Sequence, residues 1–119
     1  MNRKMFKAIF RSLLSLVGIL LVLICAWGIW TTRVPRAPAT EPCTEAWFAY
    51  LEENYFSTSD EEGHGPDEGD SEWFYTFERK AKLQDGDGLP KQLRCQRIQD
   101  QLRHRTYVIN RPLELSFSF

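Results

Sequence analysis

The chain has few cysteines, and one stretch of it has no charge at all. Between Leu13 and Trp30 stand eighteen residues without a single Asp, Glu, Lys or Arg, which a solvated surface helix would carry. As a helix this stretch spans about 27 Å at ~1.5 Å per residue, close to the ~30 Å hydrocarbon core of a bilayer. The sequence therefore predicts one transmembrane helix at residues 13–30.

The flanks of this stretch predict its orientation. Residues 1–12 carry four cations and no acid, and cations of this kind hold their end of a helix in the cytoplasm. Residues 31–40 are a Pro-rich linker, and residues 41–119 then form a small extracytoplasmic domain. In a bacterium this is a single-pass protein of the cell inner membrane with a periplasmic domain. A cleaved secretory signal is the alternative, although the apolar part of a signal is usually shorter, about 7–15 residues.

Cysteine is scarce enough to limit the possible disulfides. Cys43 and Cys95 are the only two beyond the membrane, where the compartment is oxidising, and Cys25 lies within the apolar stretch. A bond between Cys43 and Cys95 would close a loop of about fifty residues, worth roughly 4 kcal/mol in the chain-entropy model. We predict this disulfide; two free thiols are the alternative.

Positive charge is missing from half of the domain. Glu41 to Glu78 include twelve carboxylates and no Lys or Arg, whereas Arg79 to Arg111 include nine Lys or Arg against three Asp. The simpler account is that the two halves neutralise each other through surface pairs worth ~0–1 kcal/mol apiece. The alternative is a charged face that orients an oppositely charged partner.

The first half of the domain predicts a helix, a loop and a strand. A helix of about fourteen residues starts at a Thr40 cap with Pro42 in its first turn. Residues 57–71 have three glycines and no apolar side chain, which is typical of a loop. Residues 73–83 alternate as a strand with Trp73 inward, and their aromatic richness favours this strand over a helix capped by Ser71.

The second half predicts a helix and two strands. The helix starts at Pro90, buries Cys95 and points Arg94 outward. The strands cover residues 106–109 and 113–119, and four apolar residues of the last strand face inward: Leu113, Leu115, Phe117 and Phe119. The fold class is therefore α+β, with two helices and a short antiparallel sheet in the order α-β-α-β-β after the transmembrane helix.

No pattern of a nucleophile elbow, phosphate-binding loop, zinc site or EF-hand occurs, so we predict no catalytic residue and no cofactor. A nucleic-acid motif is also missing, which leaves a protein at or near the membrane as the expected partner. The distinctive string is GHGPDEGD in the predicted loop, where glycines let the backbone approach a ligand. Its candidate binding residues are His64, Asp67, Glu68 and Asp70.

These features predict a membrane-anchored binding protein, either an accessory subunit of an envelope complex or an immunity-type inhibitor. One alternative is a small enzyme or metal-binding module in which His64, Asp67 and Asp70 supply one nitrogen and two oxygen ligands. Another alternative is a subunit of a membrane complex that acts through its transmembrane helix, residues 13–30.

Overall fold

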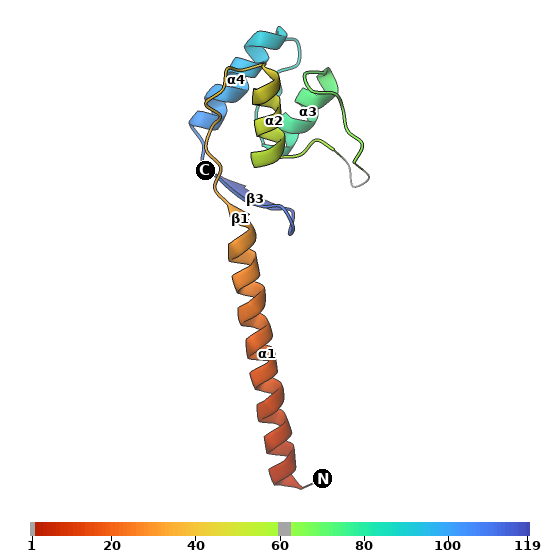
Figure 1. Cartoon of the computed structure of the whole chain (residues 1–119), viewed down its shortest axis with the longest axis vertical. Helices are drawn as coiled ribbons and strands as arrows, with labels where there is room; N and C mark the ends of the chain where they lie inside the picture. Colours follow the sequence, from red (N-terminus) through yellow and green to blue (C-terminus); the bar gives the residue numbers. More distant parts are fainter. Residues whose placement is uncertain (1, 60–62) are drawn as a thin grey trace. The chain divides into compact units, whose positions relative to one another are not determined.

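The computed structural model describes residues 2–59 and 63–119 and contains helices together with a small sheet (Figure 1). The helices are α1 (Arg3–Thr31), α2 (Glu45–Asn54), α3 (Ser71–Lys80) and α4 (Lys91–Arg103). The strands are β1 (Thr32–Arg33), β2 (Tyr107–Asn110) and β3 (Leu115–Ser118), and they form an antiparallel sheet in the order β1-β2-β3. The predicted α+β class is confirmed.

The chain divides into two compact units. The first consists of Met1–Arg33 with Asn110–Leu115, and the second consists of Val34–Ile109 with Ser116–Phe119. Both units therefore combine segments that are far apart in the sequence.

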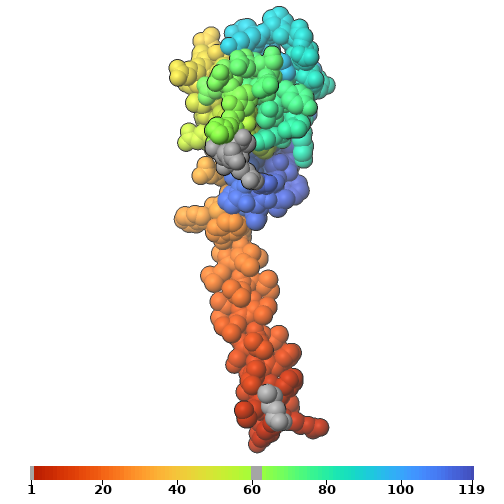
Figure 2. All heavy atoms as spheres, turned by 90° about the vertical axis from the view of Figure 1, so that its right-hand side faces the viewer, coloured from red at the N-terminus to blue at the C-terminus, as the bar shows by residue number. Residues whose placement is uncertain are grey.

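Helix α1 of the first unit contains the whole uncharged stretch. Its 29 residues include no buried side chain, and Figure 2 shows side chains exposed along it. Asn2 caps its start by accepting a hydrogen bond from the Lys4 backbone N–H at 3.2 Å. At ~1.5 Å per residue the helix is about 43 Å long, so it is long and apolar enough to cross a membrane.

The second unit has an aromatic core between α2, α3 and α4. Trp47 and Phe48 of α2 pack edge-to-face, and Trp73 and Phe77 of α3 stack with ring centroids 5.1 Å apart. Such rings each bury about 150–250 Å², which gives a small domain a large apolar core. The buried apolar side chains are Trp47, Phe48, Leu51, Tyr55, Trp73, Phe74, Phe77, Ala81, Cys95, Ile98, Leu102, Tyr107 and Ile109.

The predicted disulfide is present in the second unit. Cys43 lies just before α2, Cys95 is fully buried in α4, and their Cα atoms are 5.5 Å apart. The bond ties the start of the domain to its last helix across 52 positions of sequence.

The start of α2 differs from the prediction. Thr44, not Thr40, is the cap, and its hydroxyl oxygen accepts a hydrogen bond from the Trp47 backbone N–H. Cys43 has φ 67°, which no α-helical residue adopts, so the helix cannot extend back through Pro42. The result is a helix of 10 residues rather than about fourteen.

The predicted strand at residues 73–83 is wrong, because α3 occupies this segment. Phe74 is buried and Tyr75 is 56% exposed, the reverse of what strand alternation requires. A helix instead places Trp73 and Phe77 on the core side. Acidic Glu72 in the first turn and basic residues in the last turn suit the helix macrodipole, which adds to the preference for a helix.

The predicted orientation of the last strand is also wrong. Its apolar residues were expected inward, but all four are exposed, with fractions of 48–79% at Leu113, Leu115, Phe117 and Phe119. The serines between them, Ser116 and Ser118, are the half-buried positions. The alternation along the strand was predicted correctly, but the side that is buried was not. A two-residue repeat shows that the two faces of a strand differ and does not show which face meets the core.

The Pro-rich linker packs against the second unit over part of its length. Pro38 is buried, and its carbonyl accepts a hydrogen bond from the buried Gln99 side chain at 2.8 Å. The Arg36 carbonyl accepts another from the Tyr50 hydroxyl at 2.8 Å. Gln99 also accepts a hydrogen bond from the Trp47 indole N–H, so this part of the linker is joined to the core.

Candidate binding surface and buried ion pair

The described part of the Gly-rich loop is held close to its own chain and to α4. At Gly65 an added Cβ would lie 2.8 Å from Ser59 Cα, so backbone packs on backbone there. Gly69 has φ +86°, and an added Cβ would meet the Lys91 ammonium at 2.7 Å. Gly65 thus permits a backbone contact that a side chain would block, and Gly69 adopts a left-handed conformation that favours glycine.

All four predicted binding residues lie on the surface. His64, Asp67, Glu68 and Asp70 are exposed, and Asp70 stands at the N-cap position of α3 without a side-chain capping bond. The Asp67 carbonyl accepts a hydrogen bond from the Asp70 backbone N–H at 3.1 Å, which forms a turn before the helix. The surface position of these residues suits contact with a partner.

Glu68 belongs to a group of acids that the sequence separates. Partial burial, then the charges of Glu52 and Glu45, raise the pKa of the Glu68 carboxyl above its ordinary value. The Glu68 carboxyl of the loop therefore lies within electrostatic range of two carboxylates of α2. We call Glu45, Glu52 and Glu68 the acidic surface.

Glu52 also fixes the loop to the domain. Its carboxylate accepts hydrogen bonds from the Thr58 backbone N–H at 3.0 Å, from the Thr58 hydroxyl, and from the Trp73 indole N–H at 2.8 Å. One side chain of α2 thus positions both the start of the loop and the first turn of α3. Sequence reasoning missed this role, because no local pattern links positions 52, 58 and 73.

A metal centre receives no support from the geometry. In residues 2–59 and 63–119, no three His, Cys, Asp or Glu side chains come close enough to hold an ion. The candidates His64, Asp67 and Asp70 are therefore not gathered into a ligand set, and His104 makes a contact of 2.7 Å with the Asp100 carbonyl instead.

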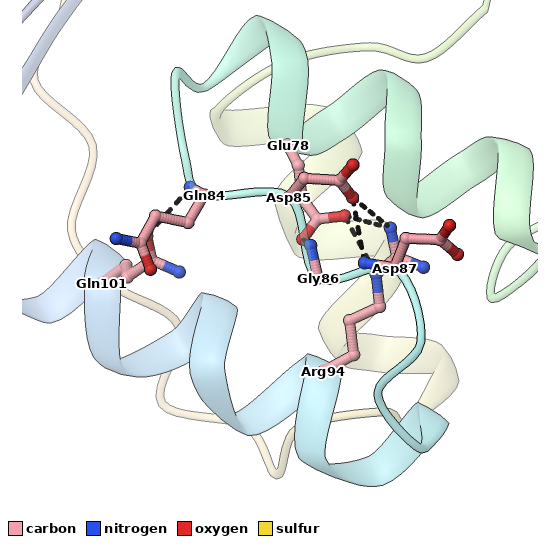
Figure 3. Close-up of polar contacts among 7 residues, drawn as sticks. All are labelled: Glu78, Gln84, Asp85, Gly86, Asp87, Arg94 and Gln101. Carbon is pink, nitrogen blue, oxygen red and sulfur yellow. Dashed lines mark hydrogen bonds and ion pairs between the residues drawn. The ribbon is translucent and has the colours of Figure 1, made fainter.

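Arg94 and Glu78 form a buried ion pair between α4 and α3 (Figure 3). Both side chains are under 10% exposed, and the Arg94 Nε donates to Glu78 Oε1 at 2.9 Å. The other carboxylate oxygen accepts from the Gly86 backbone N–H at 2.9 Å. The guanidinium also lies over the Phe74 ring, 4.9 Å from its centroid, so the prediction that Arg94 points outward is wrong.

Gly86 has to be glycine for this pair to close. An added Cβ there would lie 2.8 Å from Glu78 Oε2 and 2.9 Å from Arg94 Cγ. Asp85, next to it, adds a second carboxylate 3.6 Å from the guanidinium (Figure 3). The turn between α3 and α4 therefore belongs to this polar cluster through Asp85 and Gly86.

A pocket of about 210 Å³ adjoins this cluster and is lined by Tyr75, Glu78, Arg79, Leu83 and Asp85. The Arg79 guanidinium lies 5.6 Å from the Tyr75 ring centroid. The Glu78 carboxylate already accepts hydrogen bonds from Arg94 and from the Gly86 backbone N–H. The chemistry of this cluster is structural: it joins α3, the turn and α4.

Within the described residues, the acidic and basic halves are joined by the Glu78–Arg94 ion pair. Among the residues that the structure describes, the ion pairs are Glu78–Arg94 and Asp85–Arg94. Within that same part of the chain the exposed carboxylates Glu45, Glu68 and Glu72 join no ion pair. These three carboxylates of the acidic half are therefore exposed and form no ion pair with a described cation.

No family model matches this chain, and neither a curated protein nor a solved structure shows significant similarity to it. The fold itself defines a class: a small α+β domain with one disulfide and a long apolar N-terminal helix.

Proposed function

We propose that the chain is a single-pass membrane protein whose extracytoplasmic domain binds a basic segment of a protein partner at the membrane. The observation that supports it is the acidic surface. Carboxylates from α2 and from the Gly-rich loop gather there, and exposed ones are not neutralised by cations of the described chain. Such a field mainly speeds and orients the encounter with an oppositely charged partner.

The membrane span supports this function by restricting where the partner is met. Helix α1 has the length and composition of a transmembrane helix, and the linker after it is partly packed on the domain. A tethered domain meets a membrane partner at a high effective concentration, so weak electrostatic binding suffices. An accessory subunit of an envelope complex and an immunity-type inhibitor are the two forms of this function that we propose.

Affinity purification of the full chain in mild detergent, followed by mass spectrometry, tests the proposal. We expect a partner whose recovery falls with added salt, because exposed charges are screened beyond about 10 Å at 0.1 M ionic strength. Replacing Glu45 and Glu68 by Lys reverses two charges of the acidic surface and should abolish recovery. The matched control replaces Asp87 and Asp100, two exposed acids outside this surface, and should leave recovery unchanged. Equal losses in both variants would contradict the proposal.

A function carried by the transmembrane helix is the second candidate, because every side chain of α1 is unburied and available to another helix. Replacing residues 13–30 by an unrelated membrane span, with the four N-terminal cations kept, separates the two. Binding through the acidic surface survives this exchange, whereas a helix-borne interaction is lost.

A further inference from the structure

The end of α1 is joined to a turn that lies eighty residues further along the chain. Asn110 is 6% exposed, and its side-chain amide nitrogen lies 3.0 Å from the Gly28 carbonyl, 2.8 Å from the Thr31 hydroxyl and 3.2 Å from the Thr32 hydroxyl. Its amide oxygen accepts a hydrogen bond from the Leu113 backbone N–H at 3.0 Å. Asn110 therefore holds the turn 110–115 against the last turn of α1, within one compact unit.

The position of this contact along α1 sets its depth in a membrane. The uncharged part of α1 runs from Arg11 to the end of the helix at Thr31, a separation of about 30 Å at ~1.5 Å per residue. That separation matches a hydrocarbon core of ~30 Å, so Gly28, Thr31 and Thr32 fall at its outer boundary. Trp27 and Trp30, which are 47% and 87% exposed, occupy the same level, where indole rings favour the lipid interface.

The turn held at this level presents apolar side chains outward. Leu113 and Leu115 are 48% and 52% exposed and belong to the same unit as α1. In β3 the pattern is inverted, since Leu115 and Phe117 are exposed whereas Ser116 and Ser118 are half-buried. A strand in water normally turns its apolar positions to the core, so this arrangement indicates a non-aqueous surrounding.

We propose that Leu113 and Leu115 are a second membrane-contacting element, inserted into the lipid interface beside the end of α1 and held there by Asn110. The lipid surface is favoured as the occupant because the apolar turn is hydrogen-bonded to the outer end of the apolar helix, so both meet the same bilayer. The inference rests on the proposed membrane span of α1. The polar Asn110 amide stays satisfied at this depth because acceptors of α1 surround it.

Nitroxide accessibility in vesicles tests it. The full chain with Cys25→Ala is reconstituted in phosphatidylethanolamine and phosphatidylglycerol, and single cysteines are introduced by Leu113→Cys, Leu115→Cys, Leu20→Cys or Leu93→Cys and then labelled without reduction. Leu20 reports the span, and Leu93 on α4 is a matched control because it is an exposed leucine of similar exposure, 53%. Oxygen, which concentrates in lipid, should relax the labels at 20, 113 and 115 severalfold more than a water-soluble nickel chelate. The order should be reversed at position 93.

The possible results distinguish lipid contact at Leu113 and Leu115 from the membrane span of α1. Lipid contact at position 20 with water contact at 113 and 115 would overturn the inference and leave the span intact. Water contact at position 20 would overturn both. Labels at 113 and 115 that neither reagent reaches would show that protein covers this face, which also overturns a lipid contact. Asn110→Ala should move the label at 113 toward water without changing the one at 20; if that variant misfolds, the labels in the Asn110 protein still decide the question.

Discussion

At the scale of single residues, the N–H and O–H groups of buried Trp and Tyr side chains select one packing arrangement of the aromatic core. The Trp47 indole donates to Gln99, the Trp73 indole donates to Glu52, and the Tyr107 hydroxyl donates to the Ala81 carbonyl at 2.7 Å. Each bond joins two different elements, whereas the rings alone would tolerate several packings. In the described residues no buried side-chain nitrogen or oxygen lacks a partner, so this core has no internal polar strain to relieve.

Arg94→Met should destabilise the domain strongly. The change leaves the Glu78 carboxylate buried with only the Gly86 N–H as a donor, and removing one partner of a buried pair costs about 3–5 kcal/mol. Urea unfolding of the full chain in detergent, followed by near-ultraviolet circular dichroism, measures this loss. Adding Glu78→Gln should recover part of it, because the amide needs no counter-charge and still accepts from Gly86. Arg97→Met is the control: the bond of Arg97 to Gln84 is exposed, so a loss of similar size there would refute a special role for the buried pair.

Glu68→Gln should stabilise the fold, and only above acidic pH. The folded-state pKa of Glu68 is raised, so the folded chain disfavours the carboxylate, and this penalty disappears as the pH falls below the ordinary value of 4.5. At neutral pH the gain should lie within the ~0–1 kcal/mol of exposed charges, reduced by salt. Melting temperatures of both proteins across this pH range measure it, with Asp87→Asn as the control outside the acidic surface. A gain that persists at low pH would contradict an electrostatic origin.

At the scale of elements, sequence reasoning succeeded where one pattern had one explanation. The long uncharged stretch predicted the apolar part of α1, and the helical spacing after Pro90 predicted a helix that buries Cys95, as α4 does. It failed at α3, where aromatic residues favour strands in general but tertiary packing decided the outcome. The buried pairs Trp73–Phe77 and Phe74–Glu78, each four residues apart, are the helical pattern in this segment. It was hard to recognise because one of the buried residues, Glu78, is charged.

The polar parts of the candidate site were beyond prediction for a different reason. Arg94 and Gln99 are usually surface residues, and each is buried here only because a partner from another helix or from the linker satisfies it. Such pairings depend on the fold and produce no recognisable spacing of residues in the sequence. The loop residues His64 and Asp67 were placed correctly on the surface because glycine and acid content act locally.

Cys95→Ala should show how much the domain depends on its disulfide. The bond constrains the unfolded chain across 52 positions, and Cys95 is also fully buried between helices. Loss of a native disulfide from a small domain costs about 2–5 kcal/mol, so the variant should unfold at much lower urea concentration. Cys25→Ala, which alters the free cysteine in α1, is the matched control and should leave the midpoint in place. Equal midpoints for all three proteins would mean that packing alone stabilises the domain.

At the scale of the whole molecule, we expect the apolar helix and the disulfide-bonded domain to depend on the same cations at the N-terminal end. In the topology that we propose, cations of the N-terminal end orient α1, and this orientation decides whether Cys43 and Cys95 meet an oxidising compartment. It also decides which side of the membrane the acidic surface faces. We therefore expect the proposed topology, the disulfide and the proposed binding to depend on the same four side chains: Arg3, Lys4, Lys7 and Arg11.

Replacing these four cations by Gln should mix the topology of the protein. Without them the nearest charges are Arg33 and Arg36 at the other end of the helix, and these would draw that end to the cytoplasm. A reporter that is active only outside the cytoplasm, fused after Phe119, should be fully active in the native chain and should lose a large part of its activity in the variant. The fraction with an oxidised Cys43–Cys95 pair, read from a non-reduced digest, should fall in parallel, because inverted molecules keep both thiols reduced. Adding Arg33→Gln and Arg36→Gln removes the competing charges and should restore part of both signals. A native chain whose C-terminal reporter is silent would refute the proposed orientation and, with it, an acidic surface that works outside the cytoplasm.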